Sequence, residues 1–174
     1  GADRLEVGGD LADGGLAPEP RLVAEVRRRT TLHLRPMVRL RAGYGTDGGE
    51  VTRLRGLIAA YLDAGADGVQ LGFLNGLGEV DREVLDALLT EASCPWTFHR
   101  AFDSGLDTDK AWRALRGFPT LDAVATAGSA RDVEHGLDDL LARAADPWAA
   151  GLILASGGLL PEHDVVVIDE AHQL

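Results

Sequence analysis

The order of apolar and amphipathic segments constrains this chain more than any other feature. Short apolar runs, which we expect to be β-strands, alternate with longer segments whose apolar residues recur at helical spacing. Strand followed by helix, repeated along a chain, predicts a parallel sheet with right-handed crossovers. The expected strands are Asp3–Val7, Leu32–Arg39, Gly68–Phe73, Trp96–Arg100, Leu121–Thr126 and Gly151–Ala155, and the expected helices are Glu19–Arg29, Glu50–Ala64, Arg82–Glu91, Asp109–Gly117 and Arg131–Ala144.

An internal repeat favours a barrel over a flat sheet. Residues 1–8, Gly-Ala-Asp-Arg-Leu-Glu-Val-Gly, match residues 65–72, Gly-Ala-Asp-Gly-Val-Gln-Leu-Gly, in register. Each copy sets one polar residue, Glu6 or Gln70, between apolar neighbours, so this side chain faces away from the covering helices. A barrel builds its site from such residues, whereas helices cover both faces of a doubly wound sheet. We therefore predict an α/β fold, a TIM (β/α) barrel.

The length predicts that the barrel is incomplete. A complete TIM barrel takes about 250 residues, whereas this chain has 174. We expect one domain over residues 1–174, with about six βα units and a short tail strand at Val165–Ile168. The first βα unit and part of the last are expected to be lacking. Exposed strands beside a gap favour self-association, so a homodimer is a further expectation.

Charge and composition narrow the class of protein. The net charge of −11 argues against a nucleic-acid partner, which needs a basic face. No apolar run approaches the roughly 18 residues of a membrane span, and no signal-peptide pattern opens the chain. The single cysteine, Cys94, excludes an internal disulfide framework and a multi-thiolate metal cage. These features predict a soluble cytoplasmic protein.

The densest polar motif is Thr-Phe-His-Arg-Ala-Phe-Asp at residues 97–103. Alternation sets Thr97 and His99 on one face of the strand, and His99, Arg100 and Asp103 follow at its carboxyl end. His99 is a candidate general acid or base, or a metal ligand. The competing interpretation is a histidine hydrogen-bonded inside the barrel for structural reasons.

Two arginines and a glycine pair are candidate anion-binding groups. Arg39 and Arg41 share a face near the same end of the barrel, and guanidinium groups suit carboxylate or phosphate ligands. They could instead neutralise Glu6. Gly157 and Gly158 follow the last strand, where backbone N–H groups could hold phosphate, although a glycine pair is also an ordinary turn.

These motifs, in this order, resemble those of the CutC family. The resemblance implies a TIM barrel, a cytoplasmic location and a role in copper handling. Members proposed to bind copper have a cysteine where this chain has Gly8, and Cu(I) prefers thiolate or thioether ligands. Because Gly8 replaces that cysteine, Met37 would be the soft donor at this end of the barrel if its side chain points inward. The matching segments are Gly1–Glu6, Asp13–Pro18, Val38–Arg41, Thr97–Asp103, Thr126–Gly128 and Gly157–Gly158.

Three hypotheses remain open. The first is a CutC-like copper homeostasis protein that binds Cu(I) without catalysis. The second is a barrel enzyme acting on a small metabolite with a phosphate or carboxylate, in which His99 transfers a proton and Glu6 or Asp103 orients it. The third is a polar barrel interior with a purely structural role. Ligand-binding residues in the second hypothesis are Arg39, Arg41, Gln70, Arg100, Thr126, Gly157 and Gly158.

Overall fold

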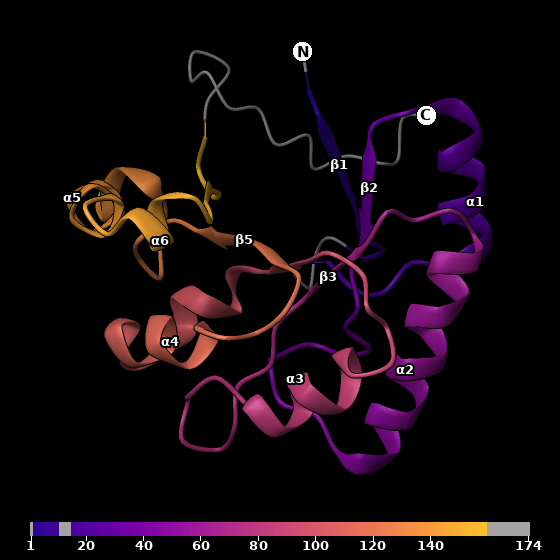
Figure 1. Cartoon of the computed structure of the whole chain (residues 1–174), viewed down its shortest axis with the longest axis horizontal. Helices are drawn as coiled ribbons and strands as arrows, with labels where there is room; N and C mark the ends of the chain where they lie inside the picture. Colours follow the sequence, from indigo (N-terminus) through magenta and orange to yellow (C-terminus); the bar gives the residue numbers. More distant parts are fainter. Residues whose placement is uncertain (1, 11–14, 160–174) are drawn as a thin grey trace.

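Strands and helices alternate as predicted in the computed structural model, which describes residues 2–10 and 15–159. The helices surround the strands (Figure 1). The expected tail strand lies outside the described residues. The strands are β1 (Arg4–Val7), β2 (His33–Pro36), β3 (Val69–Leu71), β4 (Trp96–Phe98), β5 (Leu121–Thr126) and β6 (Ile153–Ala155). The helices are α1 (Pro20–Arg29), α2 (Gly48–Asp63), α3 (Arg82–Leu89), α4 (Thr108–Leu115), α5 (Val133–Ala144), α6 (Pro147–Ala150) and the 3-10 helix η2 (Arg100–Ser104).

The strands are parallel and follow one another in chain order. β1 pairs with β2, and β3, β4, β5 and β6 form a second ladder. A bridge between Met37 and Gln70, with a 2.8 Å hydrogen bond from Val38 N–H to the Gln70 carbonyl, joins the two ladders. No pairing joins β1 to β6 within the described residues. The described strands therefore form a large arc of a TIM barrel, and the predicted fold class is confirmed.

Helix caps explain where the structure departs from the expected boundaries. The Asp47 carboxylate accepts a hydrogen bond from the Glu50 N–H, so α2 begins at Gly48 rather than at Glu50. Asp132 caps α5 in the same way, so that helix begins at Val133 rather than Arg131. The sequence pattern misses α6 and η2 because elements of four or five residues are too short to have a measurable period.

The hydrophobic core lies between the strands and the helices. Alternation along β4 is as predicted: Trp96 and Phe98 point into this core, whereas Thr97 and His99 point into the barrel. The Trp96 ring packs edge-on against Phe118, with ring centroids 5.7 Å apart. Other fully buried core residues are Val7, Leu34, Leu54, Ile58, Tyr61, Val69, Leu71, Leu85, Leu88, Leu115 and Val124.

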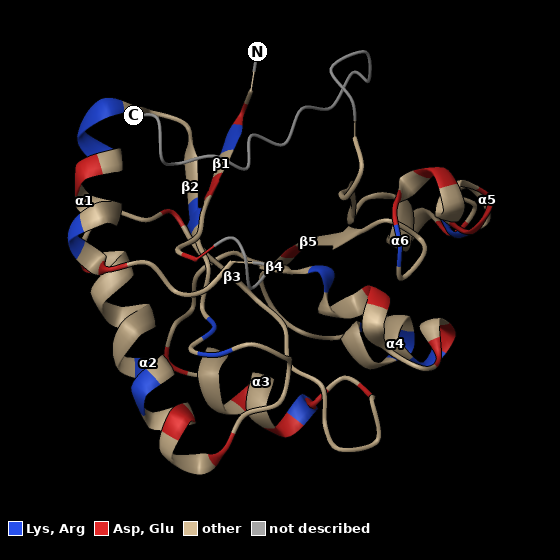
Figure 2. Cartoon of the chain, turned by 180° about the vertical axis from the view of Figure 1, so that it is seen from behind, with Lys and Arg blue, Asp and Glu red and all other residues tan. Residues whose placement is uncertain are grey.

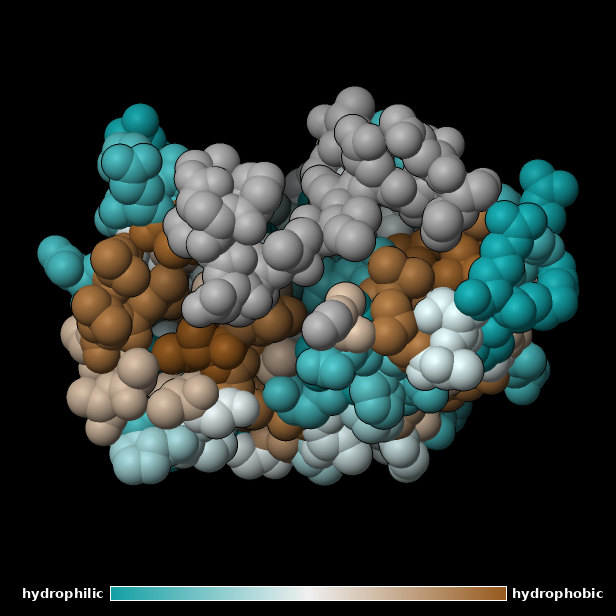
Figure 3. Space-filling view, turned by 90° about the horizontal axis from the view of Figure 1, so that it is seen from above, coloured by the Kyte–Doolittle hydropathy of each residue, from teal (hydrophilic) through white to brown (hydrophobic). Residues whose placement is uncertain are grey.

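Charged residues are scattered over the helices. Acidic and basic residues are spread along α1, α2 and α4 (Figure 2). Apolar residues nevertheless gather in two areas of the face seen from above (Figure 3). Leu137 and Leu141, one turn apart on α5, are more than half exposed. No helix in residues 2–10 and 15–159 is long and apolar enough to cross a membrane.

The interior of the barrel is polar at two levels. The amino-end level consists of Arg4, Arg35, Thr97 and Asp122. Arg4 donates to Thr97 Oγ1 at 3.0 Å, and both arginines form ion pairs with Asp122. A Cβ atom at Gly68 would lie 1.9 Å from Arg35 Nη1, so glycine is required there. This level ties β1 and β2 to β4 and β5 across the interior.

Candidate active site

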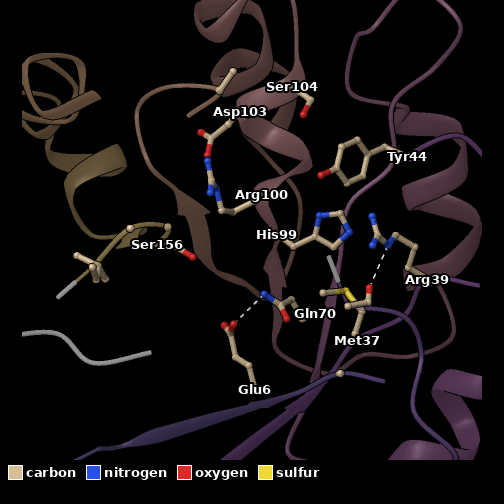
Figure 4. A pocket seen from close by; sticks show the side chains of 16 residues that line it. Glu6, Met37, Arg39, Tyr44, Gln70, His99, Arg100, Asp103, Ser104 and Ser156 are labelled. Carbon is tan, nitrogen blue, oxygen red and sulfur yellow. Dashed lines mark hydrogen bonds and ion pairs between the residues drawn. The ribbon is translucent and has the colours of Figure 1, made fainter. Parts of the chain in front are cut away.

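A pocket of about 500 Å³ opens at the carboxyl ends of the strands (Figure 4). Catalytic and binding residues of TIM barrels gather at this end, because side chains from several strands converge there. The pocket brings together most of the residues that the sequence predicted for a site. Glu6, Arg39, Gln70, His99, Arg100, Asp103, Gly157 and Gly158 line it.

Two predicted site residues lie outside the pocket lining. Arg41 donates to both carboxylate oxygens of Glu50, at 2.9 and 3.0 Å, and its side chain is half-exposed. Thr126 is buried behind Asp103 and donates to that carboxylate. Arg41 therefore stabilises the start of α2, and Thr126 supports a pocket residue from behind.

His99 is held rigidly at the end of β4. It is 3% exposed, and its Nδ1 atom accepts a hydrogen bond of 3.0 Å from the Ala101 N–H. This bond ends the strand and begins η2. A Cβ atom at Gly72 would lie 2.9 Å from Nδ1, so the glycine makes room for the ring. Ala101, rather than Glu6 or Asp103, therefore orients the imidazole.

The hydrogen bond at Nδ1 fixes the chemical form of His99. Because Nδ1 accepts a hydrogen bond, the proton of the neutral ring is on Nε2. Burial, and then the nearby Arg39 guanidinium, lower the pKa of His99 to about 3. Nε2 is buried and has no hydrogen-bond partner among the described residues. At neutral pH, His99 is thus a neutral N–H donor whose acceptor is missing.

Arg39 and Tyr44 surround His99 at this side of the pocket (Figure 4). Arg39 is 4% exposed, and its Nε donates to the Gly15 carbonyl at 3.1 Å. The Tyr44 ring lies 5.3 Å from the Arg39 guanidinium carbon and 5.5 Å from the His99 ring. No periodicity in the sequence marks Tyr44 as a site residue, because it lies in the segment after β2. One cation and one neutral donor therefore lie on this side of the pocket.

Glu6 and Gln70 lie together in the pocket, away from the Arg39 guanidinium (Figure 4). Gln70 Nε2 donates to Glu6 Oε2 at 2.9 Å. These are the two polar residues of the internal repeat, on β1 and β3, and the fold brings them into contact. The pocket therefore has the Glu6 carboxylate on one side and the Arg39 guanidinium on another.

Asp103 and Arg100 brace the loops around the pocket. Asp103 Oδ2 accepts from Arg100 Nε at 2.8 Å and from the Ala127 N–H at 2.9 Å. Arg100 Nη2 donates to the Arg131 carbonyl at 3.1 Å. A Cβ atom at Gly157, where φ is +99°, would lie 2.2 Å from Arg100 Nη1. This network, together with Thr126, fixes the carboxyl ends of β4, β5 and β6 relative to one another.

The described residues that line the pocket offer Cu(I) one thioether and no thiolate. Met37 lines the pocket and supplies a thioether, but the Nε2 atom of His99 is protonated and the Arg39 cation lies nearby. Cys94 is buried in the amino-end half, and burial raises the pKa of its thiol. The described part of the chain contains no cluster of three or more histidine, cysteine or acidic residues that could hold a metal.

The architecture and the pocket define a (β/α)-barrel protein with a polar site at the carboxyl ends of its strands. The chain belongs to the CutC family, whose pattern it matches over residues 1–171. It is 35% identical to a family protein CutC of Xanthomonas axonopodis pv. citri over 170 residues, 95% of this chain and 69% of that protein. A CutC protein of Klebsiella pneumoniae is 31% identical, with 91% of this chain and 64% of that protein covered. The chain thus spans about two thirds of these relatives.

A solved structure supports the fold. The CutC protein of Streptococcus agalactiae, whose name assigns it provisionally to copper homeostasis, superposes with a TM-score of 0.80. The superposition covers 90% of this chain and 79% of that one, at 24% sequence identity. At this identity the similarity establishes the barrel architecture and leaves the chemistry of the pocket to its own residues.

Proposed function

We propose that the pocket binds a small anionic metabolite, and that His99 donates its Nε2 proton to an oxygen of that ligand. The observation that carries this proposal is the buried Nε2 atom, which has no acceptor among the described residues. A buried donor without an acceptor costs about 1–3 kcal/mol. A ligand oxygen would remove that cost, so the protein is organised for a partner in this pocket.

The charge near His99 specifies the kind of ligand. The Arg39 guanidinium lies close enough to His99 to affect its pKa, and it favours an anionic group. A volume of about 500 Å³ is within the range of small-molecule sites. A compound of a few carbon atoms with a carboxylate or a phosphate satisfies both conditions.

Calorimetric titration with pyruvate and with inorganic phosphate tests this proposal. We expect wild type to bind at least one probe. His99→Leu removes the donor at similar volume and should weaken binding about tenfold or more, whereas His99→Gln retains an N–H donor and should bind better than His99→Leu. Arg41→Gln, outside the pocket, is the matched control. Equal affinity of His99→Leu and wild type would contradict the proposal.

A second proposed function is a role in copper homeostasis, the role in the name of the streptococcal neighbour. The observation in its favour is Met37, whose thioether faces the pocket (Figure 4). Anaerobic Cu(I) titration against a competing chelator tests it with wild type, Met37→Leu and Cys94→Ser. Binding lost only in Met37→Leu would support copper at the pocket. Loss only in Cys94→Ser would indicate an adventitious thiol, and no binding would argue against Cu(I) as a ligand.

The cytoplasmic location and the homodimer remain predictions. The exposed Leu137 and Leu141 on α5 are consistent with a covered surface in an assembly. Light scattering coupled to size-exclusion chromatography would measure the oligomeric state directly.

A further inference from the structure

We propose that the pocket holds a phosphate group between Arg100 Nη1 and the backbone N–H groups of Gly157 and Gly158, while His99 binds an oxygen at the other end of the same ligand. The proposal rests on the proposed function, because it concerns the same pocket and the same ligand. It adds the class of ligand, a small phosphomonoester with a second oxygen-bearing group.

Arg100 is fixed in place and has one nitrogen left for a ligand. Its Nε donates to Asp103 Oδ2 at 2.8 Å, and its Nη2 donates to the carbonyls of Ser129 and Arg131 at 3.3 and 3.1 Å. Nη1 has no hydrogen-bond partner among the described residues, and the side chain, which is 32% exposed, lines the pocket. Because three contacts already hold the planar guanidinium, a ligand at Nη1 would cost little further side-chain entropy.

Two backbone N–H groups lie beside this nitrogen. Gly157 and Gly158 line the pocket, and a Cβ atom at Gly157 would lie 2.2 Å from Arg100 Nη1. The Gly157 carbonyl accepts a hydrogen bond of 3.0 Å from the Val133 N–H. In a trans peptide the next N–H points the opposite way, so the Gly158 N–H points away from α5. Neither glycine N–H has an acceptor among the described residues. One cation and two N–H groups therefore meet here without an acceptor.

The carboxylates beside these donors have donors of their own. Asp103 accepts from Arg100 and from the two further donors described above. Asp132 lies next to Gly158, where a Cβ atom would be 2.7 Å from Asp132 Cβ. Its Oδ1 accepts from the His135 N–H at 3.0 Å and contacts His135 Nδ1 at 2.6 Å. These hydrogen bonds offset the two negative charges, so an anion can bind at the remaining donors.

A phosphate group suits this set of donors. It has three strong acceptor oxygens, and guanidinium groups and successive backbone N–H groups are the donors that bind such oxygens. Arg100 and Ser156, the neighbour of Gly157, lie on the opposite side of the pocket from Arg39 and Tyr44 (Figure 4). A ligand with its phosphate at Arg100 therefore extends across the pocket to place another oxygen at His99 Nε2.

Calorimetric titration with glycerate and with 3-phosphoglycerate tests the proposal, because the two probes differ only by the phosphate. We expect wild type to bind 3-phosphoglycerate about tenfold more tightly or better. Arg100→Gln should bring the two affinities to within about threefold of each other. Ser156→Glu, which adds a carboxylate beside the glycines and keeps Arg100, should do the same. Arg113→Gln, on the exposed surface of α4, changes the net charge as much as Arg100→Gln and should keep the wild-type ratio.

The outcomes separate this proposal from the proposed function. Equal affinities of wild type for the two probes would overturn the phosphate site and leave ligand binding intact. Failure of both probes, and of pyruvate and inorganic phosphate, to bind would overturn both proposals. A wild-type ratio retained in Arg100→Gln and Ser156→Glu would show that the phosphate does not bind at Arg100. Thermal midpoints identify a variant that unfolds, and if Arg100→Gln does so, Ser156→Glu decides.

Discussion

The two levels of the barrel interior contain similar residues and differ in how their charges are arranged. At the amino end, Arg4 and Arg35 converge on one carboxylate, Asp122, across the interior. At the carboxyl end, the positive Arg39 lies beside the neutral His99. At the first level two guanidinium groups share one carboxylate, whereas at the second Arg100 pairs with Asp103 and the Arg39 guanidinium lies beside a neutral histidine.

The difference bears on which level has a structural role and which has the proposed binding role. Ion pairs between strands that are distant in sequence hold the arc of β1 to β5 together. A buried neutral donor with no acceptor stabilises nothing in the ligand-free protein. A purely structural interior suits the amino-end level, and at the carboxyl-end level it stays the alternative to the proposed ligand binding. Buried atoms without partners occur at the amino-end level too, at Arg35 Nε and Nη1 and Asp122 Oδ1, but there the two charged groups pair with each other.

The largest expected effect on stability is at the amino-end level. Asp122→Asn removes the carboxylate that both arginines share, and an unpaired buried guanidinium is costly. We expect the free energy of unfolding to fall by about 3 kcal/mol. Urea unfolding followed by tryptophan fluorescence measures it. The control is Asp109→Asn, which removes the exposed α4 carboxylate that pairs with Arg143 of α5. An unchanged unfolding midpoint would show that Asp122 does not hold the barrel together.

The pH dependence of stability gives an intermediate effect at the carboxyl-end level. The unfolded chain protonates His99 near pH 6.5, whereas the folded protein does so near pH 3. The folded protein keeps His99 neutral, and the resulting contribution to the free energy of unfolding is complete above pH 6.5. Between pH 6.5 and pH 3 this contribution falls by about 1.4 kcal/mol per pH unit. Between pH 6.5 and pH 5, wild type should lose about 2 kcal/mol more than His99→Gln. If wild type and His99→Gln lost the same free energy of unfolding over this pH range, the folded state would not lower the pKa of His99.

The smallest effect is expected at the loops around the pocket. Thr126→Val removes one of the donors to Asp103, while Arg100 and the Ala127 N–H remain. We expect a loss of about 1 kcal/mol in the free energy of unfolding. Thr52→Val, on the exposed surface of α2, is the matched control. If Thr126→Val lowered the free energy of unfolding as much as Asp122→Asn, the two levels would contribute equally to stability.

Much of the candidate site could be predicted from the sequence. Alternation along β4 put His99 inside the barrel, and the repeat put Glu6 and Gln70 on the same side of their strands. These inferences succeed because strand periodicity depends only on local geometry. Alternation did not predict the position of Arg41, because β2 ends at Pro36, earlier than expected, and Arg41 lies outside the lining of the described pocket. Its partner Glu50 lies on the following helix.

The sequence by itself determined the order of strands and helices, the barrel architecture, and which polar residues meet at the carboxyl end. Backbone periodicity and chain connectivity fix these features. Only the tertiary structure decided what those residues can do. The Ala101 N–H sets the tautomer of His99, burial beside Arg39 keeps the ring neutral, and contacts from three residues hold Asp103 at the rim of the pocket. Each of these properties depends on distances between atoms from different strands and loops, which no pattern along a single strand specifies.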